Sequence, residues 1–227
     1  MNTKTKICGL RDLQSLCVSA QYGADFVGIV FVPNTRRCLP TDQAQSLLQK
    51  FRSDANNDKS QIVGLFANQS IEEVNAIIKA CRLDYVQLCG DETIDYCKKI
   101  SAQAIKVTHV HHEANVTQET SRLLQEVDHY TKYGVMVTLD RYSSTVPGGS
   151  GHTFNWDIAS EIAQRFPIVL AGGLTPSNVT EALQQVNPIG VDVSSGVETN
   201  GTKDTKKIMS FLEEVHSADS NENSKVE

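Results

Sequence analysis

The 227-residue sequence lacks the features of a membrane-bound or secreted protein. It contains no apolar run of ~18 residues, which is the length that a transmembrane helix needs. Its first ten residues, MNTKTKICGL, include no long apolar segment, so we expect no secretory signal. Basic residues are not in excess, because 21 Lys and Arg stand against 27 Asp and Glu, and the formal net charge is −6. This balance argues against a nucleic acid or an anionic membrane as the main partner.

Cysteine pairs at metal-binding spacings are also missing. Successive cysteines are 9, 21, 43, 8 and 8 positions apart, and none of these spacings matches a zinc pattern such as C-x-x-C. In a chain of this size without a secretory signal, reduced thiols are the default, so we expect a cytoplasmic protein without a disulfide framework. The cysteines are Cys8, Cys17, Cys38, Cys81, Cys89 and Cys97.

The chain does contain a regular alternation of short apolar runs and amphipathic segments. The predicted strands span 5–8, 25–31, 61–66, 84–89, 104–110, 134–140, 167–171 and 189–194. Several are rich in Val and Ile without two-residue alternation, which is typical of strands covered on both faces. The predicted helices span 12–23, 41–51, 71–82, 92–100, 116–132, 156–166, 175–186 and 205–215.

Eight strands that alternate with eight helices predict parallel βαβ units, and eight such units close into a (β/α)8 TIM barrel. An open, doubly wound sheet is the alternative, since alternation alone does not exclude it, but the count of eight favours the barrel. We place one catalytic barrel domain at residues 1–216 and expect the polar segment 217–227 to be a disordered tail. The polar stretch 53–60 is expected in a loop at the opposite end of the barrel from the active site.

In a barrel of this kind, active sites lie at the carboxyl ends of the strands. Gly172 and Gly173 follow the seventh predicted strand, and Ser195 and Gly196 follow the eighth. Glycines let the backbone approach a ligand closely, and free N–H groups at a helix start attract anions. We therefore predict a phosphate site in these two loops, with tight turns between strand and helix as the alternative.

Two titratable residues end strands that would face the same pocket. Cys8 taken alone is more typical of a small buried apolar residue. Asp140 taken alone fits equally well a general acid with a raised pKa or a structural carboxylate that binds a loop amide. Together, and beside a phosphate site, they suit proton transfer with one donor and one acceptor.

Two further motifs are weaker signals. GGSG at 148–151 lies in the long loop after the sixth predicted strand, and we interpret it either as a mobile cover over a substrate or as a passive linker. HVHH at 109–112 puts His109 and His111 on one face of a strand. No neighbouring carboxylate or cysteine completes a metal-ligand set, so we expect histidines of an exposed loop and no metal site.

Seven motifs follow one another in order along the chain. They are KICGL (6–10), DFVGIVF (25–31), VQLCG (86–90), LD (139–140), GGSGHTFNW (148–156), LAGGLTPSNV (170–179) and GVDVSSGVETNG (190–201). In this order they resemble phosphoribosylanthranilate isomerase, a family of tryptophan biosynthesis built on a single (β/α)8 barrel. The match runs to about residue 215, and the insertion 53–60 is similar to fungal members.

The resemblance implies an Amadori rearrangement that needs no metal or cofactor. N-(5-phosphoribosyl)anthranilate would become 1-(2-carboxyphenylamino)-1-deoxyribulose 5-phosphate. Asp140 would protonate the furanose ring oxygen, and the Cys8 thiolate would take the proton from C2 of the sugar. The basic residue after the second strand matches Arg37 better than Arg36, and it would bind the anthranilate carboxylate.

The same resemblance implies the remaining substrate contacts. The phosphate would be held by Gly172, Gly173, Ser195 and Gly196, and further contacts would come from Asp192 and Gln87. The partner is thus a small phosphorylated molecule, with no nucleic acid and no membrane. No apolar stripe stands out on a predicted helix, so we expect a monomer.

Two positions depart from the family pattern. Cys89 in QLCG stands where the family usually has histidine, and His152 stands where it often has lysine. Another phosphate-binding barrel enzyme, such as a sugar-phosphate epimerase, is an alternative function, and so is a phosphate-binding barrel without catalysis. The pairing of Cys8 with Asp140 argues against both.

Overall fold

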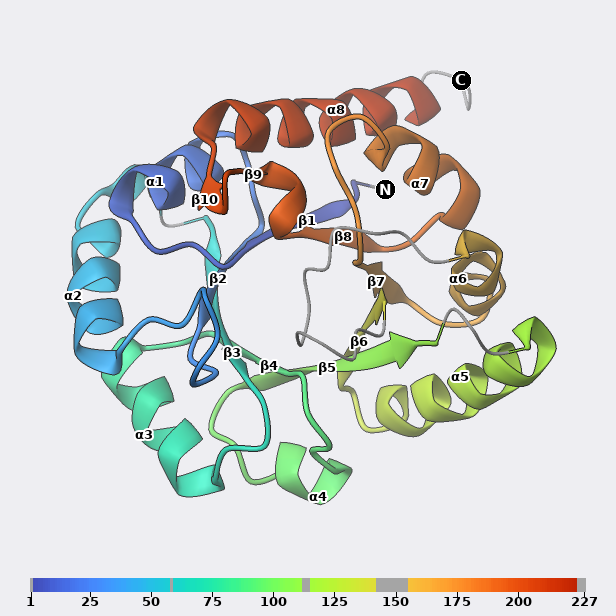
Figure 1. Cartoon of the computed structure of the whole chain (residues 1–227), viewed down its shortest axis with the longest axis horizontal. Helices are drawn as coiled ribbons and strands as arrows, with labels where there is room; N and C mark the ends of the chain where they lie inside the picture. Colours follow the sequence, from blue (N-terminus) through green and yellow to red (C-terminus); the bar gives the residue numbers. More distant parts are fainter. Residues whose placement is uncertain (1, 58, 112–114, 142–154, 224–227) are drawn as a thin grey trace.

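Eight parallel strands close into a barrel, and the helices cover its outside (Figure 1). The computed structural model describes residues 2–57, 59–111, 115–141 and 155–223. The strands are β1 (Lys4–Cys8), β2 (Phe26–Val30), β3 (Gln61–Phe66), β4 (Tyr85–Leu88), β5 (Gln103–Val110), β6 (Met136–Arg141), β7 (Ile168–Leu170) and β8 (Gly190–Val193). Each strand pairs with the next, and β8 pairs with β1 through Lys4 opposite Gly190 and Ile7 opposite Val193. This closure confirms the barrel and rules out the open sheet.

The strands form where the chain can be buried on both faces. All five residues of β2 are buried, and β3 is buried from Ile62 to Phe66. Side chains of one face fill the barrel, and those of the other face pack beneath the helices. A fully buried Val or Ile contributes ~1.5–3 kcal/mol relative to an exposed one, so these short runs stabilise the sheet from both sides.

The main helices follow the strands in turn. They are α1 (Leu13–Gln21), α2 (Thr41–Arg52), α3 (Ile71–Cys81), α4 (Ile94–Cys97), α5 (Val116–Thr131), α6 (Trp156–Ala163), α7 (Val179–Val186) and α8 (Thr205–Asn223). Side-chain caps mark several starts, as where Asp12 accepts a hydrogen bond from the Ser15 N–H at 2.8 Å. No helix within the described part of the chain has both the length and the apolar character needed to cross a bilayer.

The segment between β7 and α7 differs from the prediction. We expected a helix from residue 175, but α7 begins at Val179. The Asn178 side chain accepts a hydrogen bond from the Thr175 N–H at 2.8 Å and donates one to the Gly173 carbonyl at 3.0 Å. These bonds hold residues 173–178 in a turn, so the helix starts later.

Short elements that we did not predict lie in two loops. The 3-10 turn η1 (Ala55–Asn57) lies in the polar stretch before β3. After β8, the chain forms the 3-10 turn η2 (Ser195–Val197) and an antiparallel hairpin of β9 (Glu198–Thr199) and β10 (Thr202–Lys203). The hairpin thus lies at the carboxyl end of β8, where sequence motifs placed the site.

The prediction of a disordered tail from residue 217 is wrong for residues 217–223, because α8 continues to Asn223. Asp219 is only 8% exposed, and its two carboxylate oxygens accept bonds from the backbone N–H and the hydroxyl of Thr3 at 2.8 and 2.7 Å. Ala218 also packs against the apolar core. The end of α8 is therefore fixed to the start of β1. The remaining tail residues, 224–227, lie outside the described residues.

Candidate active site

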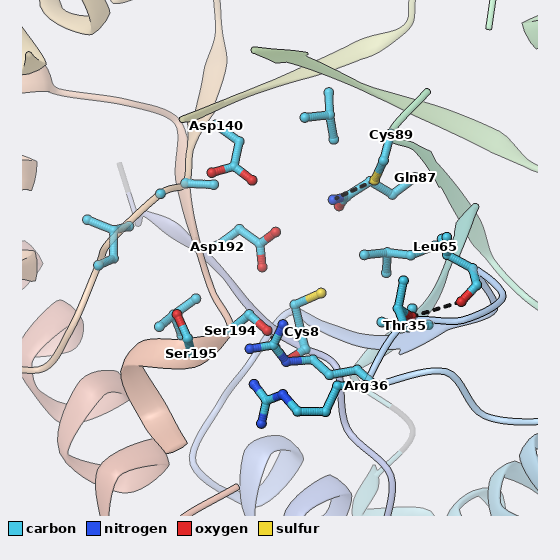
Figure 2. A pocket seen from close by; sticks show the side chains of 18 of the residues that line it. Cys8, Thr35, Arg36, Leu65, Gln87, Cys89, Asp140, Asp192, Ser194 and Ser195 are labelled. Carbon is cyan, nitrogen blue, oxygen red and sulfur yellow. Dashed lines mark hydrogen bonds between the residues drawn. The ribbon is translucent and has the colours of Figure 1, made fainter. Parts of the chain in front are cut away.

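A cavity of about 420 Å³ opens at the carboxyl ends of the strands. Residues at or just after the ends of all eight strands line it, among them eight of the nine that sequence motifs singled out. These eight are Cys8, Arg37, Gln87, Asp140, Gly172, Gly173, Asp192 and Ser195. Figure 2 shows Cys8, Asp140 and Asp192 directed into one space, with Gln87 and Cys89 on another wall.

Cys8 ends β1 and is 5% exposed. It lies opposite Gly28 of β2, where an added Cβ would come within 3.3 Å of the thiol sulfur. Burial raises the pKa of the Cys8 thiol above its usual range, the charges of Lys6 and Lys203 oppose this change, and the Asp192 carboxylate adds to it. A thiolate here would be a stronger base than a solvent-exposed one.

Asp140 lies near the end of β6 and accepts a hydrogen bond from the Arg141 N–H at 2.8 Å. Gly172, in the next loop, has a φ of +88°, and a Cβ there would lie 2.9 Å from a carboxylate oxygen of Asp140. Burial raises the pKa of Asp140 to about 7, and the nearby Asp192 carboxylate contributes to the same shift. Near neutral pH this group can therefore hold or release a proton.

A buried ion pair lies beside these two groups. Lys6 and Asp192 are 2.8 Å apart, and their side chains are 4% and 7% exposed. The other carboxylate oxygen of Asp192 is buried without a hydrogen-bond partner among the described residues, and so is the amide oxygen of Gln87. Buried acceptors of this kind favour a ligand that brings hydroxyl or amine donors. We missed Lys6, although two-residue alternation in β1 places it on the same face as Cys8.

The two arginines after β2 reach the cavity, but a carboxylate of the protein holds both. Glu198 of β9 lies 2.7 Å from Nε of Arg37 and 2.6 Å from Nη2 of Arg36. Lys203 of β10 is 3.0 Å from the same carboxylate. Glu198 belongs to the GVE motif, but the sequence alone indicated no role for Glu198 or Lys203. The structure brings Arg37 to the predicted place and adds this partner.

The two predicted phosphate loops lie against each other. A Cβ on Gly196 would come 1.8 Å from the Leu174 carbonyl oxygen, so the loops after β7 and β8 are in backbone contact. Gly173 has a φ of +70°, which suits glycine in this turn. Gly173 and Ser195 line the cavity, whereas Gly196 packs behind the lining. The two loops in which we predicted a phosphate site are thus neighbours.

The loop after β4 is fixed by a second buried ion pair. Glu92 accepts hydrogen bonds from the N–H groups of Asn68 and Gly90 at 2.7 and 2.9 Å, and Lys106 lies 3.2 Å from its carboxylate. Next to Gly90, Cys89 lines the cavity, and its sulfur lies 3.9 Å from the Gln87 amide nitrogen. The residue that departs from the family pattern is thus part of the cavity wall.

His109 is not in an exposed loop as we expected. It lies in β5, lines the cavity, and its Nε2 is 3.4 Å from the Cys89 carbonyl oxygen. Burial lowers the pKa of His109, which favours the neutral ring. Among the described residues, no group of three His, Cys, Asp or Glu side chains could hold a metal ion. GGSG (148–151) and His152 lie outside the described residues.

Comparison with known proteins identifies the family to which this arrangement belongs. The family model for N-(5′-phosphoribosyl)anthranilate (PRA) isomerase matches residues 5–214. The chain belongs to the PRA isomerase family. The PRA isomerase of Dehalococcoides mccartyi is 40% identical over 218 residues, which cover 96% of this chain and 98% of that protein. This relative and two others, at 39–40% identity, are bacterial, so the expected likeness to fungal members is not supported.

Solved PRA isomerases have the same fold. The crystal structure of the Thermotoga maritima enzyme superposes with a TM-score of 0.80 at 32% identity, covering 95% of this chain and 99% of that one. Another PRA isomerase, at 29% identity and a TM-score of 0.77 over 95% and 99% of the two chains, was solved with reduced 1-(o-carboxyphenylamino)-1-deoxyribulose 5-phosphate. The strand ends that line the cavity here thus belong to the barrel of this enzyme family.

Proposed function

We propose that this chain isomerises N-(5-phosphoribosyl)anthranilate, with Asp140 as the acid and Cys8 as the base. In the first step, Asp140 donates its proton to the furanose ring oxygen as the bond from that oxygen to C1 breaks. The anilino nitrogen supplies the electron pair, and a protonated Schiff base forms. In the second step, the Cys8 thiolate takes the proton from C2, and the electrons form an enolamine. Tautomerisation of the enolamine gives the ketone product.

The observation that carries this proposal is the pairing of two groups with different proton affinities across one cavity. The pKa of about 7 for Asp140 keeps a substantial protonated fraction at neutral pH, whereas an exposed aspartate would be ionised. Burial is the largest influence on Cys8 and the Asp192 carboxylate adds to it, so the pKa of the thiol is raised overall, and the thiolate is a minor but strongly basic form that Lys6 and Lys203 favour. The two positions thus supply one proton donor and one acceptor, as the reaction requires.

The rest of the cavity fits the three polar parts of this substrate. The contacting loops after β7 and β8 offer backbone N–H groups and the Ser195 hydroxyl to the phosphate. Arg37 offers a guanidinium to the anthranilate carboxylate. The unpartnered oxygens of Asp192 and Gln87 would accept bonds from the ribose hydroxyls or the amine. These assignments agree with the roles that the family resemblance implies.

A fluorescence assay tests the function directly. The anthranilate-linked substrate should lose its emission as it turns over, and added chelator should not change the rate. A Cys8→Ser variant is the control for background decay of the substrate. A rate that depends on a metal, or wild-type protein that turns over no faster than this control, would contradict the proposal.

We further propose that the chain acts as a monomer in a reducing compartment such as the cytoplasm. Its six cysteines are all free thiols. Among the described residues, five large hydrophobic side chains are exposed, and they come from the ends of α1 and α5 and from the loop before β8. Sedimentation velocity at micromolar concentration should give a single species near 25 kDa. A dimer peak would contradict this part of the proposal.

A further inference from the structure

One carboxylate at the rim of the cavity binds three cations. Glu198 accepts hydrogen bonds from Nε and Nη2 of Arg37 at 2.7 and 3.2 Å, from Arg36 at 2.6 Å, and from Lys203 at 3.0 Å. Its side chain is 5% exposed. Burial alone would raise the pKa of Glu198, but hydrogen bonds from Arg37, the charge of Lys203 and the bond from Arg36 hold it at about 2. Glu198 is therefore charged throughout the physiological range.

The cluster joins segments that lie far apart in the sequence. Glu198 and Lys203 face each other in the β9–β10 hairpin, whereas the arginines come from the loop after β2. Lys203 also donates to the Ser194 carbonyl at 2.7 Å, and the Ser194 hydroxyl donates to the Cys8 carbonyl at 3.1 Å. Arg37, the loop after β8 and the backbone of Cys8 are thus connected through Glu198.

The geometry of the Arg37 pair determines which side of the guanidinium can meet a ligand. A guanidinium offers two forks of parallel N–H groups, one along Nε and Nη2 and one across Nη1 and Nη2. Glu198 takes the first fork. A ligand carboxylate in the cavity is left with the second fork, at the tip of the side chain. The Arg37 side chain is 13% exposed, so little space exists for it to turn to another orientation.

The charge balance of the cluster also favours a second anion. Three cations face one carboxylate, so positive charge remains in excess at the rim of a half-enclosed cavity. Without Glu198, the three cations would repel each other, and Arg37 would lose the partner that fixes its Nε edge. Charges held in place in a site of low dielectric interact more strongly with a ligand than mobile ones do.

We propose that Glu198 is a positioning residue that directs the terminal fork of Arg37 into the cavity and so makes the enzyme select substrates with a ring carboxylate. The proposal rests on the proposed function, because it assigns the Arg37 fork to the anthranilate carboxylate. It predicts that the effect of Glu198 depends on that carboxylate and not on the phosphate or the sugar.

The test compares two ligand pairs that differ only in the ring carboxylate. The substrates are N-(5-phosphoribosyl)anthranilate and N-(5-phosphoribosyl)aniline. The binding probes are reduced 1-(o-carboxyphenylamino)-1-deoxyribulose 5-phosphate and its phenylamino counterpart. Glu198→Gln keeps the shape of the side chain and removes its charge. Glu161→Gln, which removes an exposed carboxylate from α6, is the matched control.

We expect Glu198→Gln to raise KM and the dissociation constant for the carboxylated ligands about ten- to a hundredfold, which corresponds to one hydrogen bond to a charged group. The ligands without the carboxylate should change less than threefold, and kcat should change less than KM. Glu161→Gln should match the wild type. Equal weakening of both ligand types would show a merely structural role and overturn the inference, and so would unchanged preference for the carboxylate.

Two features keep the test decisive. If Glu198→Gln does not fold, Glu198→Asp keeps the charge balance but withdraws the carboxylate by one methylene, and it should also lose most of the preference. A Glu198→Asp variant with the full wild-type preference would then refute the inference. Binding of the reduced analogue is measured without turnover, so the absence of isomerase activity would refute the proposed function while leaving this comparison intact.

Discussion

Replacing Asp140 with asparagine should make the protein more stable while removing its activity. The carboxylate at the end of β6 has its pKa raised to about 7 from an ordinary value of 3.8. A group whose pKa is raised on folding contributes most to stability below its unfolded pKa, and that contribution is lost as the pH rises through the folded pKa. Ionisation of Asp140 therefore lowers the free energy of unfolding of the wild type increasingly between pH 4 and about pH 7. Asparagine keeps an oxygen that can accept the Arg141 N–H and carries no such cost.

The size of this effect follows from the two pKa values. Their difference corresponds to roughly 4 kcal/mol in the free energy of unfolding above pH 8, which is an upper limit because the carboxylate faces an open cavity. At pH 5 only roughly 1 to 2 kcal/mol of this cost has developed. In a chain of this length, 1 kcal/mol shifts the melting temperature by ~2–4 °C. The advantage of Asp140→Asn over the wild type should thus grow clearly with pH.

Urea unfolding and thermal melts of both proteins at pH 5 and pH 8 measure this difference. Turnover of Asp140→Asn at saturating substrate should fall by ~10²–10⁴-fold, as for loss of a general acid. An advantage that does not change with pH, or a variant less stable than the wild type at pH 8, would refute the reasoning. Near-normal turnover would place the acid elsewhere.

Three further changes test the other parts of the site. Cys8→Ser should keep the wild-type melting temperature and lose ~10²–10⁴-fold in turnover, because a hydroxyl is a far poorer base than a thiolate. Near-normal turnover would show that Cys8 only packs in the barrel. Gly196→Ala places a Cβ 1.8 Å from the Leu174 carbonyl oxygen, so it should lower both the melting temperature and the affinity for inorganic phosphate, and wild-type values of both would contradict the backbone contact. Inorganic phosphate at 100 times its dissociation constant should stabilise the wild type by ~2.7 kcal/mol and compete with substrate; a melting temperature that does not respond would argue against a phosphate site.

The sequence predicted the parts of this molecule that depend on local pattern. Strands β2 and β3 could be predicted because each is a short apolar run, as expected for a strand that is buried on both faces. The positions of Cys8 and Asp140 followed from the rule that barrel strands end at the active site. Helix ends were less predictable, since the bonds of Asn178 to Thr175 and Gly173 compete with helix formation in a way that periodicity does not show.

Contacts between distant segments could not be predicted in the same way. Glu198 and Arg37 are 161 positions apart, and no spacing relates them. We predicted residues 217–223 to be a disordered tail because their composition is polar. One buried carboxylate, Asp219, nevertheless binds Thr3 across 216 positions and fixes the end of α8. Both cases involve polar contacts between distant residues, and the partners are known only once the barrel has closed.

The pairing of β1 with β8 also determines when the barrel can first close during synthesis. Lys4 to Ile7 can pair with β8 only after Gly190 to Val193 have left the ribosome. The hydrogen bond from Thr3 to Asp219 can form only after a still longer part of the chain has been synthesised. Until then, one edge of β1 presents unpaired backbone groups to the cell, which is the condition under which nascent chains pair wrongly. Strand β1 is thus among the last to be paired on both edges, and Cys8 at its end acquires its surroundings only when β8 is in place.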